Sequence, residues 1–255
     1  MSQLNYKDMG EGKPVIILHG LLGMLDNWKT VGRHLSENYH IYLLDQRNHG
    51  KSFHSEAFDY TLLADDLKAF LDENGIEQAH LIGHSMGGKT VMQFAQMYPD
   101  LVDKSIIVDI APSGSSGGHK HIFDSLLSVD VGAVTSRKEV ETHLVSRGLE
   151  INIVYFLMKN LKRDSENGGF AWKANIQSLW DNYQHILAPT IGENSSEEPI
   201  LFIAGSKSGY ITDADREQIK DLFPRHQFEE IQGAGHWVHA EKPTELITLV
   251  REFLG

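Results

Sequence analysis

The chain has 255 residues, of which 41% are hydrophobic and 23% are charged, an ordinary composition for a globular protein with one large core or two small ones. Its formal net charge of −12 argues against nucleic acid or an anionic membrane as a partner. It contains no cysteine, which excludes disulfides, thiolate metal sites and a cysteine nucleophile. No apolar stretch resembles a signal peptide or approaches the length of about 18 residues that a membrane span needs, so we expect neither, and a cytoplasmic location.

The first part of the chain alternates short apolar runs with amphipathic segments. After an edge strand within 2–7, the apolar runs predict buried strands at 14–18, 40–45, 79–82 and 105–110. The amphipathic segments predict helices at 27–37, 60–74 and 88–98. Strands that alternate with helices of this length are typical of a doubly wound parallel sheet, which binds its ligands at the carboxyl ends of the strands.

The pattern changes after Pro112. A Ser/Gly linker at 113–118 is followed only by predicted helices, at 119–129, 136–147, 150–163 and 173–187. The sheet pattern then resumes with a strand at 199–205, a helix at 213–222, a strand at 227–232 and a helix at 243–253. The predicted fold class is therefore α/β, a doubly wound, mostly parallel sheet with a helical insertion. The core comprises 1–112 and 199–255, and the insertion comprises 113–198.

The candidate nucleophile is Ser85. It lies in Gly83-His84-Ser85-Met86-Gly87, which fits the pattern G-x-S-x-G between a predicted strand and a predicted helix, the context of a nucleophile elbow. The strained turn exposes the serine, and a Cβ at either glycine would clash with the neighbouring strand or helix. The helix N-terminus favours negative charge that develops beside the serine. A glycine-rich turn with a capping serine is the alternative interpretation.

A serine hydroxyl needs a base to take its proton. Among the 14 histidines, His236 is the first choice, because it lies in a Gly-x-Gly-His turn directly after the last predicted strand. That position brings it to the same sheet edge as Ser85. His239 is the alternative base. We expect His84 to be structural, because neighbouring side chains in a tight turn point apart.

An acid must orient the imidazole and stabilise its charged form. Its usual place in such chains is a turn after the strand 199–205, but this turn has Ser208 where the acid is expected. Asp109 is our first choice, because a carboxylate at the end of an otherwise apolar strand is costly to bury without such a role. Asp213 is the second choice. Ser206 or Ser208 could still hydrogen-bond to the imidazole as an auxiliary group.

An oxyanion hole needs two preorganised donors. One candidate is the backbone N–H of Met86, at the start of the helix. The other is the N–H of Leu21 in the stretch His19–Gly23, hereafter the oxyanion loop. Gly20 allows this backbone to approach a substrate, and we expect His19 to hold the loop by hydrogen bonds rather than to react. A plain glycine-rich turn is the alternative.

The order of three motifs resembles that of the α/β-hydrolase superfamily: His19-Gly20, Gly83-His84-Ser85-Met86-Gly87 and Gly233-Ala234-Gly235-His236-Trp237. Three further stretches resemble the YbfF-like bacterial esterases and their mitochondrial relatives: 45–52, 108–112 and 235–243. The resemblance implies an α/β-hydrolase fold with a helical cap over the active site. It also implies a Ser-Asp-His esterase whose acid follows the sixth strand, in agreement with Asp109. The loop Arg47-Asn48-His49-Gly50 is a further mark of this family, which we interpret as structural.

The sequence therefore predicts a serine carboxylic-ester hydrolase whose partner is a small-molecule acyl ester of short to medium chain length. Acyl thioesters stay open as substrates, because Lys159, Lys162 and Arg163 form a basic cluster that an anionic leaving group such as coenzyme A could meet; a solvated helix face is the alternative. The same fold and triad would serve a C–C bond hydrolase or a haloperoxidase-type enzyme. A non-catalytic binding protein of this fold is the alternative from another class.

No cofactor and no metal site is predicted. His119 and His121 form a histidine pair with no evident third ligand, which is more typical of a solvated linker than of a metal centre. The sequence leaves the oligomeric state open.

Overall fold

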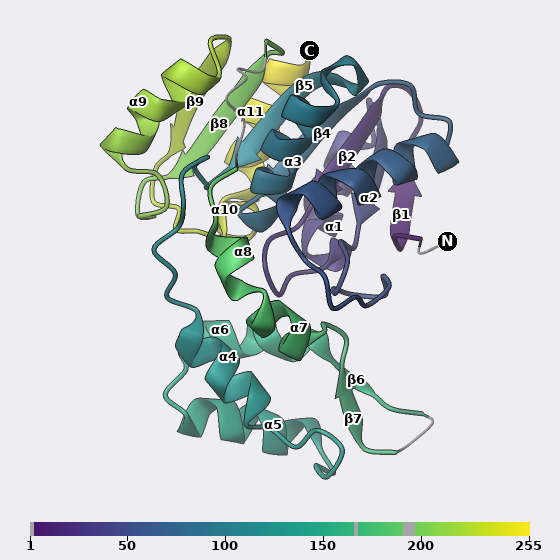
Figure 1. Cartoon of the computed structure of the whole chain (residues 1–255), viewed down its shortest axis with the longest axis vertical. Coiled ribbons are helices and arrows are strands. Elements are labelled where there is room, and N and C mark those ends of the chain that lie inside the picture. The colour runs from purple at the N-terminus through teal and green to yellow at the C-terminus, as the bar shows by residue number, and fades with distance from the viewer. Residues whose placement is uncertain (1–2, 166–167, 191–196) are drawn as a thin grey trace.

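The computed structural model describes residues 3–165, 168–190 and 197–255. Its core is a seven-stranded sheet with the strand order β1-β3-β2-β4-β5-β8-β9 (Figure 1). Strand β1 is antiparallel to β3, and the other neighbouring pairs of this sheet are parallel. The strands are β1 (Tyr6–Met9), β2 (Pro14–Leu18), β3 (His40–Leu44), β4 (Ala79–His84), β5 (Val102–Val108), β8 (Ile200–Gly205) and β9 (His226–Ile231). The predicted α/β class with a doubly wound, mostly parallel sheet is confirmed.

Helices cover both faces of the sheet, which explains why its strands β4 and β8 are buried along their whole length. On one face, apolar side chains of α2 (Tyr60–Glu73), α3 (Met86–Met97) and α9 (Asp213–Leu222) pack into one core. On the other face, α1 (Lys29–Leu35), α10 (Val238–Glu241) and α11 (Pro243–Leu254) pack into a second. Short 3-10 turns lie at Leu25–Trp28 and Pro99–Leu101. In the described part of the chain, no helix is long and apolar enough to cross a bilayer.

The chain between β5 and β8 forms a separate layer, the cap, beside the edge of the sheet where β5 ends (Figure 1). Its helices are α4 (Lys120–Leu127), α5 (Arg137–Ser146), α6 (Ile151–Leu157), α7 (Ile176–Asp181) and α8 (Tyr183–Leu187). They bury a third apolar core, which extends to Leu22 and Met86 of the sheet layer. The predicted boundaries of this insertion, 113–198, stay a prediction, since 191–196 lie outside the described residues.

The expectation that the insertion contains only helices is wrong. The helix predicted over 150–163 ends at Leu157, and a 3-10 turn, Met158–Asn160, follows. Then β6 (Leu161–Arg163) pairs antiparallel with β7 (Phe170–Trp172). Strands of three residues are too short for an alternating pattern to show in the sequence, which is why the hairpin was not predicted. The helix predicted over 173–187 is also two helices.

Two chain segments join the cap to the sheet, and hydrogen bonds hold them together. The Thr190 N–H donates to the Pro112 carbonyl at 2.9 Å. Lys89 of α3 is buried, and its ammonium donates to the carbonyls of Ser113 at 2.8 Å and of Ala188 at 2.6 Å. The helix that follows the candidate nucleophile therefore contacts both connections of the cap.

Candidate active site

Ser85 lies between β4 and α3, at the carboxyl end of a central strand. Its backbone has φ 52° and ψ −119°, a conformation that residues with a Cβ rarely adopt. Two glycines make the turn possible. A Cβ at Gly83 would lie 2.2 Å from the carbonyl oxygen of Gly87, and a Cβ at Gly87 would lie 2.5 Å from that of Leu18. The strand–turn–helix geometry that the pentapeptide predicts is present.

Asp109 and His236 are brought together from different ends of the chain. Asp109 directly follows β5 with φ 55°, and His236 lies in the loop between β9 and α10. The imidazole Nδ1 is 2.7 Å from Asp109 Oδ2. Because a carboxylate only accepts, Nδ1 carries the proton, and the lone pair is on Nε2, the form that a general base needs. The loop approaches closely because β8 ends in Gly205, where a Cβ would lie 2.3 Å from the Gly235 carbonyl oxygen.

Donors surround the Asp109 carboxylate, whose residue has an exposed fraction of 0%. Oδ1 accepts the Gly205 N–H at 2.9 Å, and Oδ2 accepts the Ser208 hydroxyl as well as the imidazole. Such donors are what a buried charge requires. Ser208 thus bonds to Asp109 and not to the imidazole, which was the contact left open for it. In the described chain, Ser206 does not contact the imidazole either, and its hydroxyl accepts the Gly233 N–H at 2.8 Å.

The alternative acid and base lie in other surroundings. Asp213 is exposed on the first turn of α9, and no contact within the described ranges joins it to His236. His239 is buried and stacks on Trp28, with ring centroids 4.6 Å apart and an angle of 15° between the planes. Burial lowers the pKa of His239 to about 3, so it stays neutral. The structure therefore pairs Asp109 with His236.

The oxyanion loop is held by hydrogen bonds that use its other backbone groups. The Gly23 N–H donates to the Gly20 carbonyl at 2.9 Å, and the Leu22 N–H donates to His49 Nε2 at 3.1 Å. The Leu22 carbonyl accepts the side-chain amide of Asn160 of the cap at 2.7 Å. Among the described residues, the Leu21 N–H has no partner. The amide of Met86, the first residue of α3, likewise has no acceptor within its helix. Both N–H groups expected to form the oxyanion hole are therefore unengaged.

His19 connects the oxyanion loop to the loop after β3. Its Nδ1 lies 2.8 Å from the Gly20 carbonyl, and its Nε2 accepts the Gln46 N–H at 3.1 Å. Burial lowers the pKa of His19 to about 4, so it is neutral near pH 7 and suited to these bonds rather than to proton transfer. Gly20 is needed here, because a Cβ would lie 2.8 Å from Nδ1 of His84. His19 and Gly20 therefore position the loop.

A cavity of about 280 Å³ contains Ser85 and His236 in its wall. No direct hydrogen bond joins the two side chains in the described structure, and such bonds are often long in a site without substrate. The apolar and aromatic residues that line this cavity come from the cap and from the sheet layer: Ile122, Ile153, Phe156, Leu157, Leu21, Leu22, Trp28, Tyr210 and Trp237. Of the cap aromatics, Phe156 lines the cavity, whereas Phe123, Trp180 and Tyr183 pack on one another inside the cap. Lys159, Lys162 and Arg163 are exposed and lie outside the lining.

Residues 13–243 match the family model of the alpha/beta hydrolase fold. This chain belongs to the α/β-hydrolase family. The hydrolase is 35% identical over 246 residues to Esterase YbfF of Escherichia coli (strain K12), which covers 95% of this chain and 93% of that protein. It is 34% identical over 253 residues to the sn-1-specific diacylglycerol lipase ABHD11 of Danio rerio, with 96% and 79% covered. A solved structure of a marine microorganism esterase is 40% identical, covers 99% of this chain and 100% of that one, and has a TM-score of 0.96. The kinship with esterases predicted from the motifs is confirmed.

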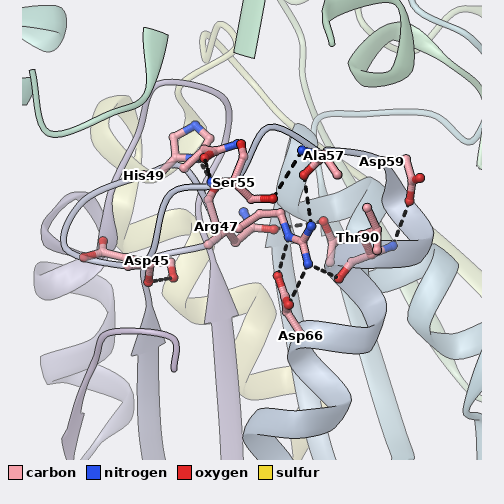
Figure 2. A network of polar contacts seen from close by, with 12 residues as sticks. Asp45, Arg47, His49, Ser55, Ala57, Asp59, Asp66 and Thr90 are labelled. Atoms are coloured by element: carbon pink, nitrogen blue, oxygen red, sulfur yellow. Dashed lines mark hydrogen bonds and ion pairs between the residues drawn. The ribbon is translucent and has the colours of Figure 1, made fainter. Parts of the chain in front are cut away.

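The loop after β3 connects the hydrolase core to its cap. Figure 2 shows Arg47 pointing to Asp66 of α2, with its Nε and Nη2 at 2.6 and 2.7 Å from the two carboxylate oxygens. The backbone carbonyl oxygen of the neighbouring Asn48 accepts the backbone N–H of Asn175 in the cap at 2.9 Å. Ser178 of the cap donates to the carbonyl of Ser55 at 2.7 Å. The interpretation of this loop as structural agrees with these contacts.

Three residues of the hydrolase site were not singled out from the sequence. Asn160 and Lys89 bond to backbone carbonyls far away in the chain, and no sequence pattern signals such contacts. Tyr210 stacks on His236, with ring centroids 3.9 Å apart and 17° between the planes. Its position, two residues after Ser208, is a signal that could have been used, because that loop was already expected to approach the base.

Proposed function

We propose that this hydrolase is a serine carboxylic-ester hydrolase with Ser85 as nucleophile, His236 as general base and Asp109 as the acid that orients it. The observation that carries the proposal is the 2.7 Å contact between Asp109 Oδ2 and His236 Nδ1 at the wall of the cavity that also contains the elbow serine. The names of its relatives as esterases and lipases support the same reaction class.

The first half of the reaction acylates the enzyme. His236 Nε2 takes the proton of Ser85 Oγ while Oγ attacks the ester carbonyl carbon, and the carbonyl electrons move onto oxygen. The N–H groups of Leu21 and Met86 stabilise this oxyanion, and the buried Asp109 carboxylate stabilises the imidazolium. When the tetrahedral intermediate collapses, the alcohol leaves with the proton from Nε2, and the acyl group stays on Ser85.

The second half releases the acid. Water replaces the alcohol, gives a proton to His236 Nε2 and attacks the acyl carbon, forming a second tetrahedral intermediate at the same donors. Its collapse breaks the bond to Ser85 Oγ, which recovers its proton from Nε2. The cycle leaves the enzyme unchanged and consumes one water for each ester.

The cavity supports short to medium acyl esters. Its volume of about 280 Å³ lies at the small end of the ligand pockets of proteins, and its wall is mainly apolar beyond the reacting groups. A coenzyme A thioester has no such support, because the basic residues Lys159, Lys162 and Arg163 lie outside the lining. Nor does any contact in the described site favour a C–C bond substrate or halide oxidation over an ester.

The test combines a fluorophosphonate probe with turnover of p-nitrophenyl butyrate. We expect one probe adduct, on Ser85, no adduct in Ser85→Ala, and a loss of most turnover in Ser85→Ala and Asp109→Asn. Asp213→Asn is the matched control, because that carboxylate is exposed, and it should turn over like the wild type. Wild-type turnover by Asp109→Asn would contradict the assigned acid. If the folded wild-type protein showed no labelling and no turnover, the result would favour a binding protein of this fold.

A further inference from the structure

The ring of Tyr210 covers one face of the catalytic imidazole. The two ring centroids are 3.9 Å apart, and the planes are nearly parallel, at 17°. Tyr210 belongs to the loop after β8, and its N–H donates to Ser208 Oγ at 3.3 Å. Ser208 in turn donates to Asp109. One loop therefore contacts both the acid and the base.

The bond to Asp109 leaves the orientation of the imidazole incompletely fixed. His236 Nδ1 lies 2.7 Å from Asp109 Oδ2, and His84 Nε2 lies 2.8 Å from the carbonyl oxygen of His236. Neither bond sets the plane of the His236 imidazole. A flat aromatic side chain against the imidazole does restrict that plane. This matters because Nε2 must face Ser85 in one step and the leaving group in the next, and small misplacements of reacting groups are costly in rate.

We propose that Tyr210 is a positioning residue of the esterase reaction, whose ring sets the plane of the His236 imidazole. The proposal rests on the proposed function, because Tyr210 acts on that reaction through His236.

The hydroxyl of Tyr210 lies beside a neutral histidine of the cap. The His119 backbone N–H donates to the Tyr183 hydroxyl oxygen at 3.0 Å, and His119 Nδ1 lies 2.8 Å from the same oxygen. On the other side of the ring, His119 Nε2 lies 3.4 Å from the Tyr210 hydroxyl oxygen. Burial lowers the pKa of His119 and raises that of Tyr210, so both side chains stay neutral in this contact.

The stack gains strength when the imidazole takes the serine proton. A cation over an aromatic face is attracted by the ring, whereas a neutral imidazole is attracted less, so the contact favours the transition state over the ground state. The other titratable side chains around His236 come from β4, the end of β5, α10 and the cap: His84, Asp109, His239 and His119. Burial lowers the pKa of each of these histidines, so they do not compete as cations near pH 7.

The test compares Tyr210→Phe with Tyr210→Leu. The Phe variant keeps the stack, and we expect kcat and the acid limb of the pH profile of kcat/KM to stay near wild type. The Leu variant keeps the site apolar but removes the π face. We expect its kcat to fall about 2- to 30-fold and its acid limb to move about 0.4 to 1.5 pH units toward lower pH, the range of a cation–π contact. Tyr210→Met replaces the Leu variant if that protein does not fold.

Trp237→Leu is the matched control. Trp237 also lines the cavity, and its ring packs on Phe156 of the cap at 5.6 Å. Removing it should change KM and leave the acid limb in place. KM alone does not decide the question for Tyr210, because that side chain lines a second cavity of about 530 Å³ as well.

Two outcomes separate this proposal from the function on which it rests. A Tyr210→Leu protein that folds, keeps the wild-type kcat and keeps the wild-type acid limb would overturn the role of Tyr210, while probe labelling and ester turnover of the wild type would leave the esterase intact. A lower kcat with an unmoved acid limb would also overturn it, since a structural role alone gives that result. Full activity of Ser85→Ala would instead overturn the proposed function.

Discussion

Removing the Ser208 hydroxyl tests whether the buried acid depends on its donors. Asp109 has an exposed fraction of 0%, and its charge is stabilised by the Gly205 N–H, the imidazole and the Ser208 hydroxyl. Ser208→Ala removes one of these donors and leaves the backbone and the base in place. Because the alanine side chain is smaller, it introduces no clash.

The expected magnitude follows from a hydrogen bond to a charged group, which is worth about 1.5–3 kcal/mol. The free energy of unfolding of Ser208→Ala should fall by that amount, which lowers the Tm by about 3–12 °C in a chain of this length. The Asp109 charge is then shared by fewer donors and attracts the imidazolium more strongly. We therefore expect the acid limb of kcat/KM to move upward by up to about one pH unit, opposite to the direction for Tyr210→Leu. Weaker orientation of the acid should lower kcat by about tenfold, which corresponds to about 1.4 kcal/mol.

The assays are urea unfolding at pH 7.5 and turnover of p-nitrophenyl butyrate from pH 5 to 9. Ser208→Thr keeps a hydroxyl and should recover most of the loss. Ser206→Ala is the control from the same loop, because that hydroxyl bonds to the Gly233 N–H, and its acid limb should not move. If Ser208→Ala matched the wild type in both stability and pH profile, the reasoning that this carboxylate needs its third donor would be refuted.

Three further predictions follow from buried contacts. Burial lowers the pKa of His49 from 6.5 to about 3, so its contribution to stability is present above pH 6.5 and is lost as the pH falls, by about 2 kcal/mol at pH 5. Urea unfolding should show that loss, and His49→Gln, which keeps an acceptor for the Leu22 N–H, should make the loss between pH 7.5 and pH 5 smaller by the same amount. An unchanged pH dependence of the free energy of unfolding in this variant would contradict the lowered pKa of His49. Asn160→Ala leaves the buried Leu22 carbonyl without its cap donor and should lower the free energy of unfolding by about 1–3 kcal/mol and reduce kcat; equal stability would show that water replaces the bond. Gly83→Ala places a Cβ 2.2 Å from the Gly87 carbonyl oxygen and should abolish fluorophosphonate labelling, so normal labelling would show that the elbow can relax.

The predictable part of this fold rests on strong local patterns. Continuous apolar runs such as 14–18 and 199–205 have few conformations open to them other than strands covered on both faces, and the structure has strands at Pro14–Leu18 and Ile200–Gly205. The helix predicted over 213–222 begins and ends as expected, because Thr212 caps it and Asp215 completes a capping box. The position of Asp109 was predictable for a related reason, since a carboxylate that ends an apolar strand requires buried partners.

The parts that the sequence did not predict depend on loops whose path is set by distant contacts. A bond from Ser206 or Ser208 to the imidazole was left open, and their loop does approach that ring, but only the backbone conformation decides that the Ser208 hydroxyl meets the carboxylate of Asp109. The hairpin of β6 and β7 has too few residues for a periodic signal, and it packs partly through Arg163 over the ring of Phe170. His236 was preferred to His239 for its place in the Gly-x-Gly-His turn, but the burial of His239 against Trp28 is a property of the tertiary structure that spacing does not show.

The contacts of the cap reach both the helix that follows Ser85 and the oxyanion loop. Lys89 lies one turn after Ser85 on α3 and donates to the carbonyls of Ser113 and Ala188, at the two connections of the cap. Asn160, within the cap, donates to the oxyanion loop. Hydrogen bonds therefore join the cap connections to the helix that follows Ser85, and the cap itself to the oxyanion loop. A displacement of the cap should accordingly alter the donors at the carbonyl oxygen as well as the acyl cavity, so that kcat and KM change together.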